Sequence, residues 1–180
     1  MNEVQPIRDK EKIEQMKREL AKNGSRDEFL FTFGINTGFR ISDIVKLKVG
    51  DVRGKSHLPL KETKTKKNRR FRLNYELQED IEKYTEGMKD EDWLFKSKRS
   101  DKHIDRFQAH KIISKAASNI GLKEISTHTM RKTFGYHFYK KTGDLAMLQD
   151  IFNHSAPSIT KAYIGISQDE IDKVIDDFHL

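Results

Sequence analysis

The chain has 180 residues, a net charge of +7 and no cysteine, which allows one sizeable buried core and favours a single domain spanning residues 1–180. The absence of cysteine excludes a disulfide framework and a thiolate metal site, and no apolar run is long enough to cross a bilayer. We expect a cytoplasmic protein without membrane contact, because polar residues rather than a signal sequence follow Met1. Lysine and arginine outnumber aspartate and glutamate by 35 to 28. This excess favours nucleic acid only weakly, since many basic domains bind none.

Helices are predicted for most of the first 48 residues, because apolar side chains recur there at helical spacing. The first helix is expected over residues 9–22, with Asp9 as its cap. A second opens at Ser25 and ends at Gly38. Ser42 is expected to cap a short third helix.

Residues 49–73 change to the alternating pattern of short strands, and a small antiparallel sheet is expected there. The apolar strand positions are Val52, Leu58, Leu60, Phe71 and Leu73, and the turn is expected at Lys66-Lys67-Asn68. This hairpin is strongly cationic. Against the single acid Glu62, it carries Lys61, Lys64, Lys66, Lys67, Arg69, Arg70 and Arg72.

Helices are predicted again over residues 75–84, 105–120, 128–141, 144–152, 157–164 and 168–178. Thr127 is expected to cap the third of these. The inward face of the second is expected to hold Phe107, Ile112, Ile113, Ala116 and Ile120. Residues 87–100 are polar enough to form a long surface connection. The pattern as a whole predicts an α+β fold, mainly helical with one small antiparallel sheet.

A set of side chains suited to a phosphodiester occurs in order along the chain: Arg40, His128, Arg131, His154 and Tyr163. His128 and Arg131 share one face of the first turn of their helix, and a helix N-terminus offers free N–H groups and a positive dipole to phosphate. Taken singly, each residue has an ordinary structural explanation, such as a solvated arginine or a half-buried tyrosine. Their conjunction with a cationic hairpin favours an enzyme acting on DNA.

These residues resemble the tyrosine recombinases, or phage integrase family. The family's first box, Thr-Gly-x-Arg-x-Ser-(Glu/Asp), is matched by Thr37, Gly38, Arg40, Ser42 and Asp43. The second, His-x-x-Arg with a later histidine and a tyrosine nine residues after that, is matched by His128, Arg131, His154 and Tyr163. Lys64-Thr65-Lys66-Lys67-Asn68-Arg69 is similar to the family's hairpin segment and places Lys64 as the catalytic lysine. The resemblance covers essentially the whole chain and implies the fold of the family's catalytic domain.

Two positions depart from the family pattern. Asn153 replaces the usual glycine before the later histidine, but asparagine tolerates the left-handed backbone better than other non-glycine residues. Arg72 replaces a common proline. Neither change removes a reacting group. The register of the hairpin is left open, since Lys61, Lys66 and Lys67 lie close to Lys64.

The resemblance implies that Tyr163 attacks a DNA phosphate, forming a 3′-phosphotyrosyl bond and releasing a 5′-hydroxyl. A tyrosine hydroxyl has a pKa of about 10, so a base assists its attack. His128 is the expected proton acceptor, since imidazole titrates near neutral pH. Lys64 is expected to protonate the departing oxygen.

The remaining residues are expected to hold the phosphate. Arg40 and Arg131 would clamp its non-bridging oxygens, His154 would hydrogen-bond to it, and Asp43 would orient a neighbouring base. The predicted DNA contacts of the hairpin are Lys66, Lys67, Arg69 and Arg70. No metal or other cofactor is called for by this chemistry.

The resemblance also implies double-stranded DNA as partner, and a homo-oligomer, a tetramer, on DNA with a monomer when free. The catalytic pattern begins almost at Met1, so core-binding and arm-binding N-terminal domains are expected to be absent. The predicted last helix, residues 168–178, would dock on a neighbouring protomer or on its own core. Two alternatives share this pattern: a type IB topoisomerase-like DNA relaxing enzyme, and a non-catalytic DNA-binding regulator.

Overall fold

The helix α2 (Ser25–Thr37) lies at the centre of the fold. The computed structural model describes residues 4–61, 68–166, 173 and 175–179. A helix buried over most of its circumference must lie between other elements, and α2 packs against α1 (Lys10–Ala21), α5 (Tyr75–Tyr84) and α7 (Thr127–Thr142). Its most buried large side chains, none more than 3% exposed, are Phe29, Leu30, Phe31 and Phe33.

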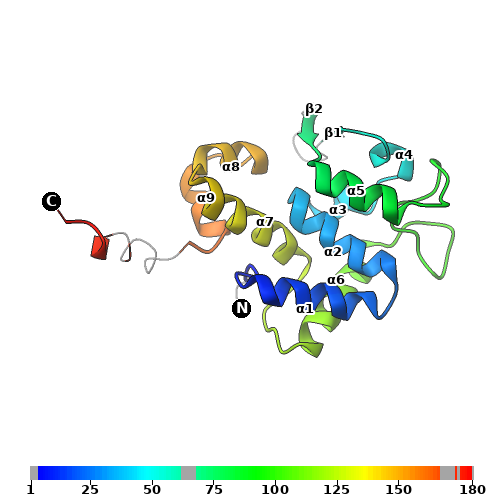
Figure 1. Cartoon of the computed structure of the whole chain (residues 1–180), viewed down its shortest axis with the longest axis horizontal. Helices are drawn as coiled ribbons and strands as arrows, with labels where there is room; N and C mark the ends of the chain where they lie inside the picture. The colour runs from blue at the N-terminus through cyan, green and yellow to red at the C-terminus, as the bar shows by residue number, and fades with distance from the viewer. Residues whose placement is uncertain (1–3, 62–67, 167–172, 174, 180) are drawn as a thin grey trace.

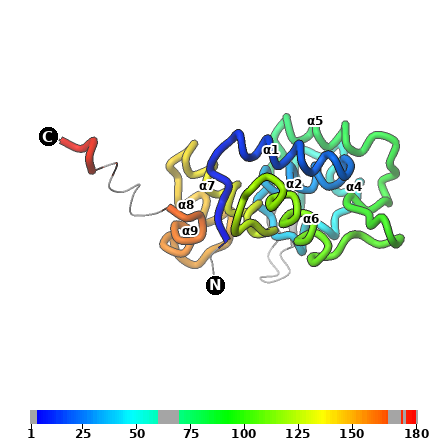
Figure 2. Tube along the Cα trace, turned by 90° about the horizontal axis from the view of Figure 1, so that it is seen from below, coloured from blue at the N-terminus to red at the C-terminus, as the bar shows by residue number. Residues whose placement is uncertain are grey.

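The other helices of the described part are α3 (Ile41–Ile44), α4 (Val49–Val52), α6 (Arg106–Asn119), α8 (Leu145–Phe152) and α9 (Pro157–Tyr163). The strands β1 (His57–Lys61) and β2 (Asn68–Arg72) pair antiparallel, with Leu58 opposite Phe71. The sheet and α5 lie on one side of α2, and α1 and α6 lie on the other (Figure 1). Helix α7 leads from this core to α8 and α9 at one end of the molecule (Figure 2).

Three apolar clusters hold these elements together. Phe29 and Phe33 of α2 face the sheet and α5, whereas Phe31 faces α1 and α6 together with Met130 of α7. The third cluster is smaller and joins α8 and α9 to the later turns of α7. Its buried residues are Leu148, Phe152 and Ile164. The position of α9 therefore depends on this small cluster.

Most of the predicted elements are confirmed. The Asp9 carboxylate caps α1 by accepting from the Glu11 N–H at 2.8 Å, and Gly38 ends α2 in the left-handed region at φ 65°. The hairpin forms the expected antiparallel sheet. Asn153 takes the expected left-handed conformation at φ 53°.

Three local predictions are wrong. Val52 lies in the short helix α4 rather than a strand, because Val49 and Val52 are both buried at a spacing that one helical turn satisfies. Arg40 rather than Ser42 is the N-cap of α3. Ser126 rather than Thr127 caps α7, since its hydroxyl accepts from the His128 N–H at 3.2 Å.

Two predictions of burial also need correction. Phe107 is 69% exposed rather than inward-facing, because the buried stripe of α6 runs through Ala109, Ile113, Ala116 and Ala117 on another side of the helix. Residues 87–100 are not wholly a surface connection, since Leu94 and Phe95 are fully buried. Asn68 begins β2 opposite Lys61 rather than lying in the turn, and Lys66 and Lys67 fall outside the described residues.

The predicted last helix, residues 168–178, falls largely outside the described residues. Of the residues described there, Ile175 is 62% and Phe178 is 65% exposed. In the described ranges, every helix is too short or too polar to cross a membrane.

A substitution at Gly135 of α7 tests how closely α7 packs against α8 and α9. A Cβ added to Gly135 would lie 2.6 Å from Ile164 Cγ2 and 2.8 Å from the Phe152 ring. Alanine normally stabilises a helix interior relative to glycine by about 1 kcal/mol. Here we expect Gly135→Ala to lower the free energy of unfolding by about 2 kcal/mol instead, because the third cluster is overpacked. Urea denaturation measures this, with Ser118→Ala on the exposed face of α6 as control. A stabilised Gly135→Ala protein would contradict the packing described.

Candidate active site

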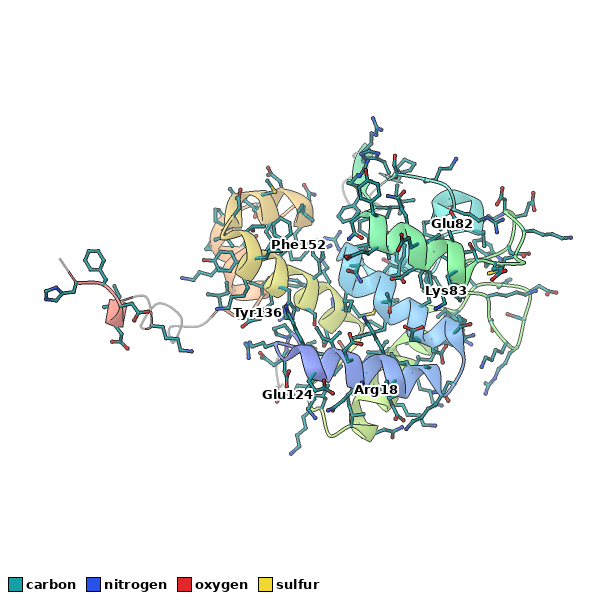
Figure 3. The ribbon with its side chains drawn as sticks, viewed as in Figure 1. Arg18, Glu82, Lys83, Glu124, Tyr136 and Phe152 are labelled. Atoms are coloured by element: carbon teal, nitrogen blue, oxygen red, sulfur yellow. The ribbon has the colours of Figure 1, made fainter. Side chains whose placement is uncertain are left out.

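The buried side chain of Arg131, on α7, joins the C-terminal ends of two other helices. Arg131 lies on α7 and is 6% exposed. Its Nη1 donates to the Gly38 carbonyl at 2.6 Å and its Nη2 donates to the Phe152 carbonyl at 2.9 Å. These carbonyls stand at the C-termini of α2 and α8, where backbone acceptors lack helical partners and the helix dipole is negative. The guanidinium also lies 4.1 Å above the ring of Phe152, which is labelled in Figure 3.

The same guanidinium hydrogen-bonds to Tyr163. Tyr163 is the last residue of α9, and its ring meets Phe152 and His154 edge-on at centroid distances of 5.6 and 5.2 Å. Burial raises the pKa of the phenol, while the positive charges of Arg131 and Arg40 oppose that shift. The hydroxyl is therefore protonated at neutral pH and lies beside fixed positive charge.

Arg40 supplies the second guanidinium of the site. It follows Gly38 closely in sequence and is half-buried. Its charge lowers the pKa of His128, His154 and Tyr163, which places all four in one electrostatic neighbourhood. Within the described part of the chain, the Arg40 side chain has no hydrogen-bond or ion-pair partner. It is thus available to an anion, whereas Arg131 is held by protein carbonyls.

His128 lies in the first turn of α7, three residues before Arg131. One edge of the residue is exposed, yet burial of the rest lowers its pKa, and the charges of Arg131, Lys132 and Arg40 lower it further. The imidazole is therefore uncharged at neutral pH. An uncharged imidazole next to a phosphate site can accept a proton.

His154 follows the left-handed residue Asn153, which turns the chain from α8 toward α9. Burial lowers the pKa of His154 to about 4, and Arg131 and Arg40 act in the same direction. Its Nδ1 lies 3.0 Å from the hydroxyl of Thr160. His154 is therefore also uncharged at neutral pH, with one ring nitrogen held by α9.

Two residues of the site were missed by sequence reasoning. Lys132 is 6% exposed, and its Nζ lies 5.1 Å from the centre of the Tyr163 ring. Thr160 is fully buried against His154. Lys132 directly follows Arg131, but no apolar pattern indicates a buried lysine. Thr160 precedes Tyr163 by three residues, so helical spacing alone could have placed it on the same face.

The remaining predicted residues are placed only in part. Lys64, Lys66 and Lys67 lie outside the described residues. On β2, Arg69 pairs with Leu60 and the exposed Arg70 pairs with Pro59. Asp43 is half-buried on α3, and its backbone N–H donates to the Arg40 carbonyl at 2.9 Å. Among residues 4–61, 68–166, 173 and 175–179, no three histidine or acidic side chains converge in a way that could hold a metal ion.

Comparison with known proteins finds the phage integrase family over residues 8–170. The chain is 54% identical over 169 residues to the probable integrase/recombinase YoeC of Bacillus subtilis, covering 94% of this chain and 93% of that protein. It is 28% identical over 165 residues to tyrosine recombinase XerC of Thermodesulfovibrio yellowstonii, covering 86% of this chain and 54% of XerC. The solved XerH site-specific recombinase, bound to a palindromic difH substrate in a post-cleavage complex, superposes with a TM-score of 0.76 at 19% identity, covering 97% of this chain and 53% of XerH.

The fold is that of a tyrosine recombinase catalytic domain, and the chain belongs to the phage integrase family. It spans nearly the whole of YoeC but about half the length of XerC and XerH. The family assignment agrees with the convergence of Arg40, Arg131 and Tyr163.

The lowered pKa of His154 gives the stability of the domain a pH dependence that can be measured. The unfolded chain binds a proton at this residue near pH 6.5, whereas the folded chain binds it near pH 4. Stability therefore falls as the pH drops through this window, because the unfolded state binds more protons. We expect His154→Gln to show a smaller fall. Urea denaturation of both proteins at several pH values between 6.5 and 4 measures the two slopes. Equal slopes would show that His154 titrates normally in the folded protein.

Proposed function

We propose that this domain cleaves and rejoins double-stranded DNA at a specific site through a 3′-phosphotyrosyl intermediate on Tyr163. The observation that carries the proposal is the hydrogen bond between the Tyr163 phenol and the guanidinium of Arg131. The guanidinium of Arg40 lies in the same electrostatic neighbourhood and has no partner among the described residues. A nucleophile beside two fixed cations suits attack on a phosphodiester, whose charge they neutralise. The similar XerH structure contains its DNA substrate, which supports DNA as partner.

The chemical step forms one bond and breaks one. The phenol oxygen of Tyr163 attacks the phosphorus and forms the 3′-phosphotyrosyl bond, while the bond from phosphorus to the 5′ oxygen breaks. The phenol proton passes to His128, whose lowered pKa keeps it uncharged and ready to accept. Lys64 donates a proton to the departing 5′ oxygen. Rejoining reverses these transfers, so the energy of the broken linkage is kept in the phosphotyrosyl bond.

Arg131 and Arg40 bind the phosphate in different ways. Arg131 is fixed by the carbonyls of Gly38 and Phe152, which pre-organises its remaining N–H groups before DNA arrives. Pre-organised donors act more strongly on a transition state than donors that must reorient. Arg40 has no such protein partner in the described part, and it closes on the non-bridging oxygens when the phosphate binds. Asp43, next to Arg40 on α3, orients a neighbouring basic group.

The cationic hairpin forms the surface along which the DNA backbone lies. Arg70 is exposed on β2, and Lys66, Lys67 and Arg69 continue the cationic segment in sequence. Each lysine or arginine that neutralises a phosphate releases counterions, so binding weakens steeply with salt. The net charge of +7 favours the same partner.

We infer that the domain acts as a homo-oligomer, a tetramer, when assembled on DNA and is a monomer when free. The exposed side chains of Ile175 and Phe178 support this. Both belong to a C-terminal segment that stands apart from α9 (Figures 1 and 2). Apolar side chains that do not pack on their own core are suited to a neighbouring protomer.

Replacement of the nucleophile tests the chemistry. Tyr163→Phe should abolish covalent capture of DNA, because no oxygen remains to attack, while noncovalent binding is nearly unchanged. The substrate is a pool of labelled nicked duplexes with random central sequence, and adducts are resolved on a denaturing gel. Wild-type adducts that form on one sequence class support a site-specific enzyme, whereas adducts and supercoil relaxation without sequence preference would favour a topoisomerase. Undiminished adduct formation by Tyr163→Phe would eliminate this residue as nucleophile.

The two arginines should differ in their effect on stability. Either Arg40→Ala or Arg131→Ala should lower the single-turnover cleavage rate on the order of 10²-fold, as for loss of an oxyanion donor. Only Arg131→Ala should also lower the free energy of unfolding, by roughly 2 kcal/mol, because it leaves the Gly38 and Phe152 carbonyls without a donor. Quench-flow cleavage and urea denaturation give the two values. Equal loss of stability in both variants would contradict the division of roles.

A further inference from the structure

The hydroxyl of Thr160 makes an unusual hydrogen bond for a buried threonine in a helix. Three other threonines, Thr37, Thr85 and Thr142, donate to the backbone carbonyl four residues earlier, at 2.8, 2.7 and 2.9 Å. Such back-bonding is the common solution for a helical threonine. Thr160 is fully buried in α9, yet its Oγ1 instead lies 3.0 Å from Nδ1 of His154. In the part of the chain that the structure describes, this is the only hydrogen bond of the Thr160 hydroxyl.

This contact decides where the proton of His154 lies. Burying a hydroxyl without an acceptor destabilises the folded state by about 1–3 kcal/mol. Among the described residues, Nδ1 of His154 is the acceptor within reach of the Thr160 hydroxyl, so the O–H must donate to it. An imidazole nitrogen accepts only when it carries no proton. Because the low pKa of His154 keeps the ring uncharged at neutral pH, the single ring proton must lie on Nε2.

Contacts of the backbone and of the ring also restrict the orientation of His154. The His154 backbone is held at both ends by Gln149, through the His154 N–H and carbonyl, each at 3.1 Å. The imidazole meets the rings of Phe152 and Tyr163 at 5.3 and 5.2 Å. Thr160 lies one helical turn before Tyr163, so the residue that orients His154 moves with the nucleophile.

We propose that Thr160 is a positioning residue that fixes His154 as the Nε2–H tautomer, so that Nε2 can only donate a hydrogen bond to the phosphate undergoing attack. In the described part, Nε2 has no protein partner. The other tautomer would present a lone pair to phosphate oxygens, which only accept hydrogen bonds, and would repel them. The inference rests on the proposed function for the identity of the acceptor, but the tautomer itself is a property of the free protein.

The first test needs neither DNA nor activity. Two-bond ¹H–¹⁵N correlation spectra of ¹⁵N-histidine-labelled protein at neutral pH distinguish a protonated from an unprotonated ring nitrogen, and His154→Asn assigns the signals. We expect an unprotonated Nδ1 and a protonated Nε2 in the wild-type protein. A wild-type His154 protonated at Nδ1 would overturn the proposal.

The second test changes the hydroxyl alone. Thr160→Val keeps the shape but removes the donor, so the spectra should show a mixture of tautomers or the Nδ1–H form. The single-turnover cleavage rate, on a nicked duplex selected from the random pool, should fall about 10-fold or more, as for loss of other orienting partners. Thr160→Ser keeps the donor and should restore both the tautomer and most of the rate. Thr85→Val, at a fully buried threonine on the far side of the core, controls for the loss of a buried hydroxyl and should alter neither.

The two readouts separate the possible failures. An unchanged tautomer and an unchanged rate in folded Thr160→Val would overturn the positioning role. If Thr160→Val does not fold, the wild-type and Thr160→Ser spectra still decide the tautomer. A wild-type protein with the expected tautomer that forms no DNA adduct would refute the proposed function while leaving the assignment of the proton intact.

Discussion

The geometry of the site depends on one buried guanidinium held between two helix ends. Arg131 reaches the Gly38 carbonyl at the end of α2 and the Phe152 carbonyl at the end of α8. Both helices end at a left-handed residue, Gly38 at φ 65° and Asn153 at φ 53°, and these turns leave the carbonyls unpaired and aimed at one point. A Cβ at Gly38 would also lie 2.5 Å from the Phe134 ring. The same interaction that closes the fold thus places the Arg131 guanidinium beside Tyr163.

The candidate site combines burial and positive charge so that Tyr163, His128 and His154 stay uncharged at neutral pH. Burial raises the pKa of the Tyr163 phenol and lowers that of the His128 and His154 imidazoles, and the two guanidiniums reinforce the effect on the histidines. In the absence of DNA, neither histidine therefore competes with the arginines for an anion. Positive charge is concentrated on arginines, which do not lose their protons, whereas the groups proposed to transfer protons are neutral at neutral pH.

The elements could be predicted, and the candidate site residues could be proposed, because their signals are local or carried by a spaced motif. Helix caps such as Asp9, the left-handed turn at Asn153 and the ordered positions of Arg131 and Tyr163 depend on short stretches of sequence. What escaped prediction depends on tertiary packing. Helix α6 buries another side than the one that carries Phe107, so Phe107 is exposed to solvent. An apolar residue at the start of a helix can lie on the buried or on the exposed side, and the sequence does not decide between them. The partnership of Thr160 with His154 requires α8 and α9 to pack together, and no spacing rule contains that contact.

The depressed histidine pKa values also connect DNA binding to proton transfer in the proposed complex. Burial lowers the pKa of His128, and the positive charges of Arg131 and Arg40 lower it further. A bound phosphodiester places a negative charge between these guanidiniums and cancels much of their field, so the pKa of His128 rises toward its ordinary value. A base with a higher pKa accepts a proton more readily, and its pKa then lies closer to working pH. By linkage, whatever raises the proton affinity of His128 on DNA binding must equally strengthen DNA binding when His128 is protonated. In the proposed mechanism, His128 is therefore the weakest base in the empty site and the strongest when the phosphate is in place. Proton transfer from Tyr163 would then be restricted to the complex with DNA.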